Sequence, residues 1–273
     1  MIENRTPLLA KDLTLSGESI VAPTQSVSML SMRDIFSTSI DRGDELLRQY
    51  YSQYEVAFPD PAERTSFERL RQRMTDPSSP LEIACFLSGD RVVGGRHYKV
   101  ISAGDTTFAY GEFTWVSPSF RGAKLGSTIR EQTETQVRSK GASFFLGDFH
   151  DPLLISEDVR ETDVKSGITP EGRIQFWAKQ GYLQLDCPYI IPPLFGQTAW
   201  VDYCKIGVKF LDDSSVCDSF EKDKVLEMFH AYWDTFGVPY RGTAEHSRYL
   251  SSFDEISSIR VIPLSEKRSF IQH

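Results

Sequence analysis

The apolar residues of this 273-residue chain follow two spacings that take turns along its length. Short runs of alternating or continuous apolar residues are typical of strands, and recurrence every three or four positions is typical of amphipathic helices. The interleaved order of the two patterns predicts an α/β (α+β) fold. The patterns predict strands over residues 26–32, 81–87, 91–102, 106–116, 143–147, 182–190 and 198–210, and helices over 44–54, 62–74, 125–140 and 170–180.

The remaining segments give the organisation of the chain. Residues 150–168 are charged and lack an apolar period, so we expect a long connection without secondary structure, and loops of that kind often serve as substrate-facing lids. Residues 218–236 carry an aromatic stripe at helical spacing, behind a capping-box pair. We therefore expect an irregular arm over 1–25, a folded domain over 26–211 and a helical extension over 212–273. The extension would pack on the domain or on a partner subunit, so a homodimer is one expected assembly.

The stretch from Val116 to Gly126 joins a strand end to a turn and a glycine-flanked helix start. Pro118 ends the strand because proline cannot donate to a strand ladder. The first N–H groups of a helix have no partner within the helix, and the aligned peptide dipoles place about half a positive charge there. The stretch therefore predicts an anion site that suits a diphosphate.

This stretch resembles motif A of the GNAT acetyltransferases, in which an arginine or glutamine, a glycine, and a glycine or alanine follow one another at short spacing. Arg121 and Gly126 fit the motif, whereas Lys124 stands at the family's middle glycine. Lysine cannot relieve backbone crowding as glycine does, but its ammonium can contact a phosphate directly. The predicted order of elements is also that of the family, and the resemblance covers roughly residues 26–210.

The resemblance implies a mixed, mostly antiparallel sheet flanked by helices, with acetyl-CoA as the co-substrate. Backbone groups of Thr114, Trp115 and Val116 would then pair with the pantetheine amides as another strand would. Trp177 stands where many members have a tyrosine that protonates the thiolate, and because an indole is no useful acid we expect it only to line the cofactor site. The diphosphate would bind the residues after the strand, namely Arg121, Gly122, Ala123, Lys124, Leu125, Gly126 and Ser127.

Two residues are candidates for proton transfer. An amine with a pKa of about 10.4 is protonated at neutral pH, and removing this proton costs about 4–5 kcal/mol, so a base is useful. Glu112 lies where many GNAT enzymes carry a glutamate base, and the alternative is a cross-strand charge on a solvated face. Tyr189 could protonate the departing thiolate, which could also leave unaided, and the alternative is a buried tyrosine bonded to a nearby carbonyl.

Four further residues are candidates for binding the acceptor. Tyr54 and Phe58 lie at the bend between the first two helices, which in this family faces the acceptor, although they could simply pack the helix pair. Asp148 and Asp151 follow a buried strand, at the edge where open α/β sheets bind ligands, and could hold an ammonium. Asp151 precedes Pro152, so turn formation is the alternative. His97 is assigned no role.

Composition and charge indicate which kinds of ligand and partner the protein has. The formal net charge of −8 disfavours nucleic acid and favours a cationic substrate. The four cysteines form no CxxC pair and no histidine stands at metal spacing, so we expect free thiols and no metal. No apolar run is long enough to cross a bilayer, and no secretory signal is recognisable, so we expect a cytoplasmic protein without membrane contact.

These observations favour an acyl-CoA-dependent N-acyltransferase, with acetyl as the default acyl group, acting on a small-molecule amine by direct attack in a ternary complex. One alternative is a non-catalytic GNAT-like module that binds acyl-CoA or another protein. Another is acetylation of a protein terminus or lysine. The Ser-His-Asp, Walker and Rossmann motifs are not found in the sequence.

Overall fold

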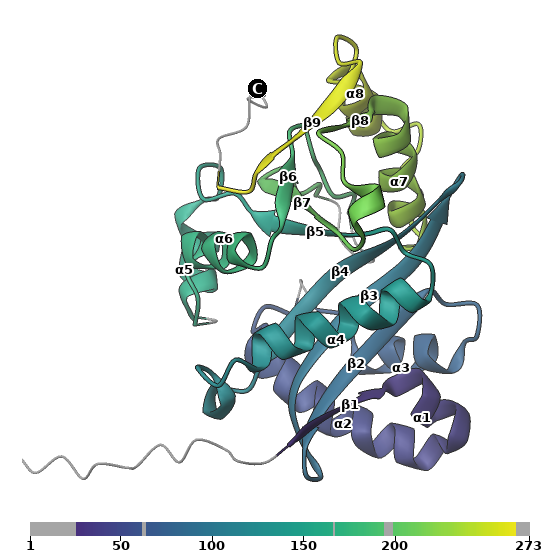
Figure 1. Ribbon diagram of the computed structural model, residues 1–273, viewed down its shortest axis with the longest axis vertical. Coiled ribbons are helices and arrows are strands. Elements are labelled where there is room, and N and C mark those ends of the chain that lie inside the picture. The colour runs from purple at the N-terminus through teal and green to yellow at the C-terminus, as the bar shows by residue number, and fades with distance from the viewer. Residues whose placement is uncertain (1–25, 62–63, 166, 194–198, 266–273) are drawn as a thin grey trace, which may run out of the picture.

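A computed structural model describes residues 26–61, 64–165, 167–193 and 199–265 and has the predicted mixed α/β architecture (Figure 1). The arm over 1–25, positions 62–63 of a predicted helix, the start of the strand at 198 and the last residues of the extension lie outside the described residues. The elements are β1 (Val27–Ser31), α1 (Met32–Thr38), α2 (Ile40–Ala57), α3 (Phe67–Thr75), β2 (Leu81–Ser88), β3 (Arg91–Ala103), β4 (Thr106–Val116), the 3₁₀ turn η1 (Pro118–Phe120), α4 (Leu125–Ser139), β5 (Phe144–His150), α5 (Glu157–Lys165), α6 (Pro170–Lys179), β6 (Leu183–Leu185), β7 (Cys204–Phe210), η2 (Asp213–Ser215), β8 (Ser219–Glu221), α7 (Lys222–Asp234), α8 (Ala244–Ser251) and β9 (Ser258–Pro263).

The strands of the described residues form one sheet in the order β1-β2-β3-β4-β5-β7-β6-β9-β8. Neighbouring strands are antiparallel except β4 and β5, which are parallel and joined through α4. The β4–β5 pairing covers only residues 109–111 against 145–147. Beyond these three pairs the two strands diverge, so the sheet is open along the last part of β4.

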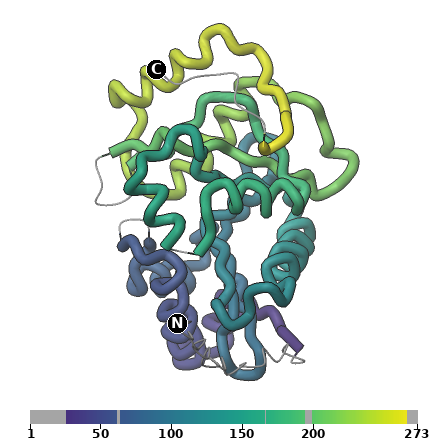
Figure 2. The backbone as a smooth tube through the Cα atoms, turned by 90° about the vertical axis from the view of Figure 1, so that its left-hand side faces the viewer, coloured from purple at the N-terminus to yellow at the C-terminus, as the bar shows by residue number. Residues whose placement is uncertain are grey.

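Helices cover both faces of the sheet. On one face, α4 and α6 bury apolar side chains such as Ile129 and Trp177 against the middle strands. On the other face, α1 to α3 pack over β2 and β3, while α7 and α8 pack over β4, β5 and β7 around Trp233. Figure 2 shows the N-terminal helices (purple to blue) and the C-terminal segment (yellow) at opposite ends of the molecule. The divergence of β4 and β5 lies between these two ends.

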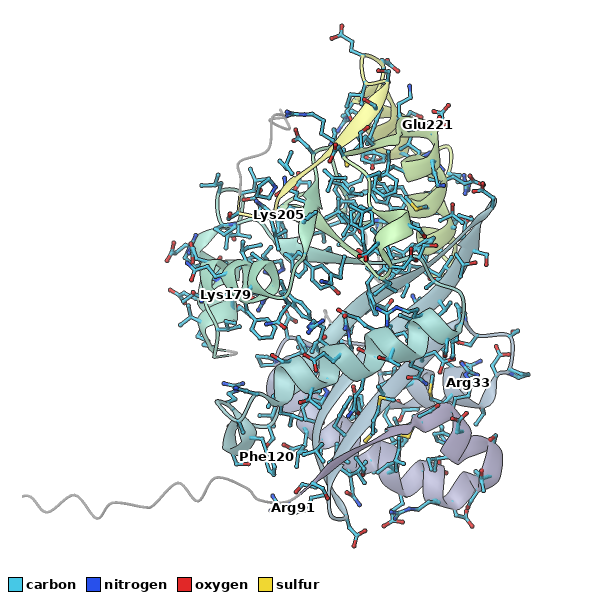
Figure 3. The ribbon with its side chains drawn as sticks, in the orientation of Figure 1. Arg33, Arg91, Phe120, Lys179, Lys205 and Glu221 are labelled. Carbon is cyan, nitrogen blue, oxygen red and sulfur yellow. The ribbon has the colours of Figure 1, made fainter. Side chains whose placement is uncertain are left out.

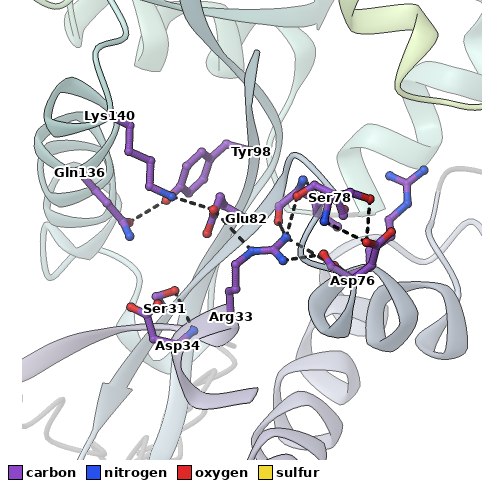
Figure 4. Close-up of polar contacts among 12 residues, drawn as sticks. Ser31, Arg33, Asp34, Asp76, Ser78, Glu82, Tyr98, Gln136 and Lys140 are labelled. Atoms are coloured by element: carbon purple, nitrogen blue, oxygen red, sulfur yellow. Dashed lines mark hydrogen bonds and ion pairs between the residues drawn. The ribbon is translucent and has the colours of Figure 1, made fainter. Parts of the chain in front are cut away.

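Arg33 fixes the position of α3 at the edge of the sheet (Figure 4). Its guanidinium donates to the carbonyl oxygens of Asp76, Ser79 and Leu81 at 2.8, 2.8 and 2.6 Å, which ties α1 to the turn between α3 and β2. Glu82, 3.6 Å from Arg33 Nε, also accepts from Lys140 after α4 at 2.6 Å. These contacts link the helices of the two faces through the start of β2.

Several sequence predictions differ from the structure. The prediction of a structureless connection over 150–168 is wrong, because α5 lies within it; acidic residues in its first turn and Lys165 in its last suit the helix dipole, but only Asp163 is buried, so no apolar period marks it. The short helix α1 was missed because Ser31 both ends β1 and caps α1. The strand expected over 182–190 is limited to β6; after it the Asp186 amide still donates to the Arg260 carbonyl of β9 at 2.9 Å, and its carboxylate accepts from the Arg260 guanidinium at 2.6 Å.

The C-terminal segment contains the expected helical stripe as α7, packed on the sheet, and a second helix, α8. It also contributes β8 and β9, which the sequence analysis missed. Strand β9 pairs with β6, so part of the segment extends the sheet of the preceding residues. All four cysteines are free, and Cys85, Cys187 and Cys204 are buried.

Candidate active site

A cleft of about 1040 Å³ lies where β4 and β5 diverge. Its lining comes from both faces of the sheet, because the gap between the strands joins the α4 side to the α3 and α7 side. The predicted residues that line it are Phe58, Glu112, Thr114, Trp115, Val116, Arg121, Gly122, Lys124, Leu125, Gly126, Ser127, Asp148 and Trp177. A site that extends through the sheet can receive two reactants from opposite sides.

The strand edge along one wall of the cleft is open. Residues 113–116 of β4 pair with β3, Glu112 lies at a β-bulge just before them, and no described strand pairs with residues 112–116 on the β5 side. Backbone N–H and C=O groups at such an edge are available to an extended ligand, as they are to another strand. This observation fits the backbone pairing expected of Thr114, Trp115 and Val116.

The start of α4 forms the adjoining wall. Phe120, labelled in Figure 3, lies in the turn η1 between β4 and α4. Helices α1, α2, α3, α6 and α8 each begin with a serine or threonine whose oxygen accepts from the first turn, whereas the N-cap of α4, Lys124, makes no such bond. Without a side-chain cap, the Leu125 and Gly126 amides remain available to an anion, whereas the Ser127 amide donates to the Lys124 carbonyl at 3.0 Å.

Lys124 holds a left-handed conformation with φ of 60°, and it is the single non-glycine residue with positive φ in the described part of the chain. A glycine is favoured at such a position because a Cβ crowds the backbone there. The departure from motif A thus falls on the residue whose conformation most favours glycine. The lysine side chain is exposed at the mouth of the cleft.

Lys124→Gly is expected to raise the free energy of unfolding by about 0.5–1 kcal/mol, because the relief of strain exceeds the added chain entropy. If the ammonium binds a phosphate, the same change weakens acetyl-CoA binding several-fold at low salt, and less at high salt. Urea unfolding and calorimetric titration measure the two effects. Lys179→Gly, at the end of α6 (Figure 3), is the control and should lower stability. A stability loss in Lys124→Gly would contradict the expected strain.

The segment after β5 closes the cofactor side of the cleft. A Cβ placed on Gly167, whose φ is +93°, would lie 2.2 Å from Arg121 Nη1, so the arginine packs directly on that backbone. Phe176 of α6 approaches Gly126 in the same way, at 3.3 Å from the position of a Cβ. Residues near the ends of α5 and α6 therefore pack on the loop that leads into α4, and the expectation that residues 150–168 form a substrate-facing lid stays a prediction.

Arg96 is a cleft residue that the sequence analysis missed. It is 2% exposed, donates to Thr133 and Tyr182 at 3.0 Å each, and its guanidinium lies 3.9 Å from the centre of the Phe145 ring. Its Nε has no partner among the described residues. A buried cation on β3, inside an apolar stretch of sequence, gives no local signal of this role.

Asp148 lies on the opposite side of the sheet gap, at the end of β5. Its Oδ1 accepts from the Tyr110 hydroxyl at 2.6 Å, and Tyr110 in turn lies 2.5 Å from the Tyr189 hydroxyl. Burial raises the pKa of the Asp148 carboxyl, although the bond from Tyr110 opposes the shift. A carboxylate with a raised pKa is the better-matched base at neutral pH.

Tyr189 is fully buried behind Tyr110 and does not line the cleft. It therefore cannot reach a thiolate in the cleft, and its expected role as a proton donor is corrected. Instead its hydroxyl is hydrogen-bonded to the Tyr110 hydroxyl, which donates to Asp148. Burial raises the pKa of its hydroxyl well above the usual value, which further weakens it as an acid.

Glu112 forms a buried ion pair. Its Oε1 lies 2.6 Å from Lys99 Nζ on β3 and 3.4 Å from the Tyr232 hydroxyl of α7. Burial alone would raise the pKa of Glu112, but the Lys99 ammonium outweighs burial and lowers it. The face of β4 that carries Glu112 is covered by α7, so the alternative of a cross-strand charge on a solvated face is wrong. The expectation that Glu112 is a base stays a prediction.

Three other predicted contacts fall outside the cleft. Tyr54 is fully buried, where it contacts His97 and Phe113, so it packs the helix pair as the alternative expected. Asp151 is 3% exposed and accepts from the Leu153 amide at 3.1 Å, which is the turn formation of the other alternative. Ala123 is exposed but does not line the cleft.

Comparisons with known proteins agree with this geometry. Residues 44–152 match the model of the acetyltransferase (GNAT) family, which confirms the resemblance drawn from the sequence. A Bacteroides thetaiotaomicron protein assigned to the GNAT acetyltransferases has a similar solved structure, with a TM-score of 0.50 and 16% identity over 78% of this chain and 99% of that one. The fold is therefore that of the GNAT acetyltransferases.

Two less similar solved structures are aminoglycoside 6'-N-acetyltransferases. One, from Enterococcus faecium, has a TM-score of 0.44 and 18% identity over 62% of this chain and 92% of its own. The other, complexed with coenzyme A, has a TM-score of 0.45 and 17% identity over 68% of this chain and 97% of that one. No curated protein sequence matches the chain. None of the described helices is long and apolar enough to cross a membrane.

Proposed function

We propose that the protein is an acetyl-CoA-dependent N-acetyltransferase whose acceptor is the amine of a small molecule. The observation that carries the proposal is one cleft that joins an uncapped α4 N-terminus and an open β4 edge to a half-buried carboxylate, Asp148, across the gap in the sheet. The match of residues 44–152 to the GNAT family supports the same activity.

Acetyl-CoA would supply the acyl group as a thioester. The amides that begin α4, with Arg121 and Lys124, would hold its diphosphate, and the open edge of residues 112–116 would hold the pantetheine arm. Arg96 has an unpartnered Nε and Trp177 offers a flat apolar surface on the same wall. These residues would bind and orient acetyl-CoA, and none of them has to move a proton.

We assign the base differently from the sequence expectation, which gave that role to Glu112 and expected Asp148 to hold the substrate ammonium. Glu112 is held as an ion pair with a lowered pKa, whereas the pKa of Asp148 is raised by burial. We therefore assign the proton of the acceptor ammonium to Asp148, directly or through water, with Tyr110 fixing the carboxylate.

Ser127→Asp tests the diphosphate site without harming the fold. Ser127 lines the cleft in the first turn of α4, where an added carboxylate suits the helix dipole, so stability should not fall. A negative charge there should repel the diphosphate and weaken acetyl-CoA binding by about 10- to 100-fold. Calorimetric titration of acetyl-CoA measures the effect, with the neutral Ser127→Asn as the matched control.

The activity itself is tested by thiol release from acetyl-CoA against a panel of amines. The expected result is binding together with amine-dependent release of coenzyme A. Binding that depends on Ser127 without release would favour the non-catalytic module, and equal binding by all three proteins would remove the diphosphate site from this corner.

A further inference from the structure

The acceptor side of the cleft is lined by cations from α3. Arg69 and Arg73 stand one turn apart on this helix and both line the cleft. Arg69 Nη2 donates to the Phe236 carbonyl at 3.1 Å, and Arg73 Nη2 donates to the Thr235 carbonyl at 3.3 Å. The two arginines thus bridge α3 to the C-terminal end of α7.

Helix capping alone leaves much of the Arg73 charge unmatched. The C-terminal end of a helix offers about half a negative charge, while the Arg73 guanidinium carries a full positive one. Arg73 forms no ion pair with any described residue, and burial together with the Arg73 charge lowers the pKa of Arg69. Two other cations at this end, Lys99 and Arg64, are matched by Glu112 at 2.6 Å and Glu55 at 3.0 Å.

The cleft therefore has two groups of opposite charge on its acceptor side. Among the described residues that line the cleft, the carboxylate without a cationic partner is Asp148 on β5, since Glu112 is matched by Lys99, and the Arg69 and Arg73 guanidiniums lie on α3. An arginine presents several N–H donors in one plane and matches a carboxylate or phosphate in paired hydrogen bonds. The net charge of −8 favoured a cationic substrate, but the cations of α3 that line the cleft favour an anionic group there.

We propose that the acceptor carries an anionic group, a carboxylate or a phosphate, besides its amine, and that Arg73 with Arg69 binds this group. The inference rests on the proposed function and narrows its substrate class to amines that are also acids. The amine would then lie toward Asp148, where the acetyl group is transferred, and the anionic group toward α3. Arg73 is a specificity-determining residue that binds the acceptor and moves no proton.

Matched acceptor pairs test the inference with the full-length protein. Each pair keeps the amine and removes the negative charge: β-alanine against β-alaninamide, glutamate against glutaminamide, and phosphoethanolamine against ethanolamine. We expect kcat/KM to be about 10- to 100-fold higher for the acidic member of at least one pair, since hydrogen bonds to charged groups contribute more than neutral ones. The first two pairs report a carboxylate and the third a phosphate.

Three variants connect the preference to the arginine. Arg73→Gln should lower kcat/KM for the acidic acceptor about 10- to 100-fold, mainly through KM, while leaving its uncharged partner nearly unchanged. Arg73→Lys should restore part of the loss. Arg71→Gln is the matched control, because Arg71 lies on the same helix but pairs with Asp44 and does not line the cleft. A fall in acetyl-CoA affinity in Arg73→Gln would overturn the inference, because the arginine would then serve the co-substrate.

The outcomes separate this inference from the proposed function. If amines are acetylated but the uncharged or polycationic ones, such as spermidine, are preferred, the inference is wrong and the function stands. If no amine is acetylated, the function fails, and calorimetry with β-alanine, glutamate and phosphoethanolamine in the presence of coenzyme A decides the anion site. Binding that is lost in Arg73→Gln would then support the site, and no binding would overturn it.

Discussion

Glu112→Gln is expected to lower the free energy of unfolding by about 3–5 kcal/mol, because it leaves the buried ammonium of Lys99 without its counter-charge. Lys99 is 1% exposed, lies 2.6 Å from Glu112, and sits between the rings of Tyr232 and Phe236 at 5.0 and 4.8 Å. Its ammonium also donates to the Thr235 hydroxyl at 2.8 Å. Neither aromatic contact nor hydroxyl replaces a full negative charge.

The double variant Lys99→Met/Glu112→Gln distinguishes this cause from a general loss of packing. Replacing both members of a buried ion pair is often neutral or stabilising, and methionine fits between two aromatic rings, so most of the lost stability should return. Urea unfolding midpoints at constant slope measure both proteins. Glu45→Gln, which removes the exposed pair with Arg42, should be indistinguishable from the parent. A double variant as unstable as Glu112→Gln would refute the unpaired-charge explanation.

The part of the site that sequence could predict is the part built from neighbours in the chain. The β4 end, the turn and the α4 start lie within some fifteen residues, and each depends on local rules: proline ends the strand, and a four-residue apolar spacing continues the helix to Gly141. The same holds for α6, where Thr169 caps the helix and Pro170 begins it. Local rules of this kind do not depend on the rest of the fold.

The acceptor side could not be predicted because it is assembled from distant segments. Glu112 gave a good motif signal, but its partner Lys99 comes from another strand, and its cover, Tyr232, lies 120 residues further on. Whether Glu112 suits the role of a base depends on the pKa of its carboxyl, and the Lys99 ammonium lowers that pKa. Arg73 has no motif, and its position beside the cleft follows from the packing of α3 against the end of α7.

Burial also decided between the alternatives for the aromatic and acidic candidates. Tyr54 and Phe58 are four residues apart, yet the first is enclosed by His97 and Phe113 and the second reaches the cleft. Asp148 and Asp151 follow the same strand, but only Asp148 faces the gap between β4 and β5. Spacing places such residues near an edge and does not determine which side chain reaches the ligand.

Asp148→Asn is expected to lower kcat by about 10²- to 10⁴-fold for any amine that the protein acetylates, because it removes the assigned base while keeping the side-chain shape. Its carbonyl oxygen can still accept from Tyr110, so the fold should be preserved. Thiol release at saturating acetyl-CoA measures the loss. In the parent, kcat should rise with pH as Asp148 loses its proton and then level off, and the variant should lack this rise.

The same substitution should stabilise the protein, and the gain should depend on pH. Burial raises the pKa of Asp148 in the folded state above its ordinary value of 3.8, so its ionisation opposes folding at neutral pH. The advantage of asparagine is therefore constant above the folded-state pKa, shrinks as the pH falls through it, and disappears below the unfolded-state pKa. Asp151→Asn, close by in the chain but outside the cleft, is the control for activity alone: it should keep kcat within about twofold, while its stability should fall because the buried Lys205 lies 3.7 Å from the carboxylate that is removed. Lower stability of Asp148→Asn at neutral pH, or an unchanged kcat, would show that this carboxyl serves the fold and does not accept the proton.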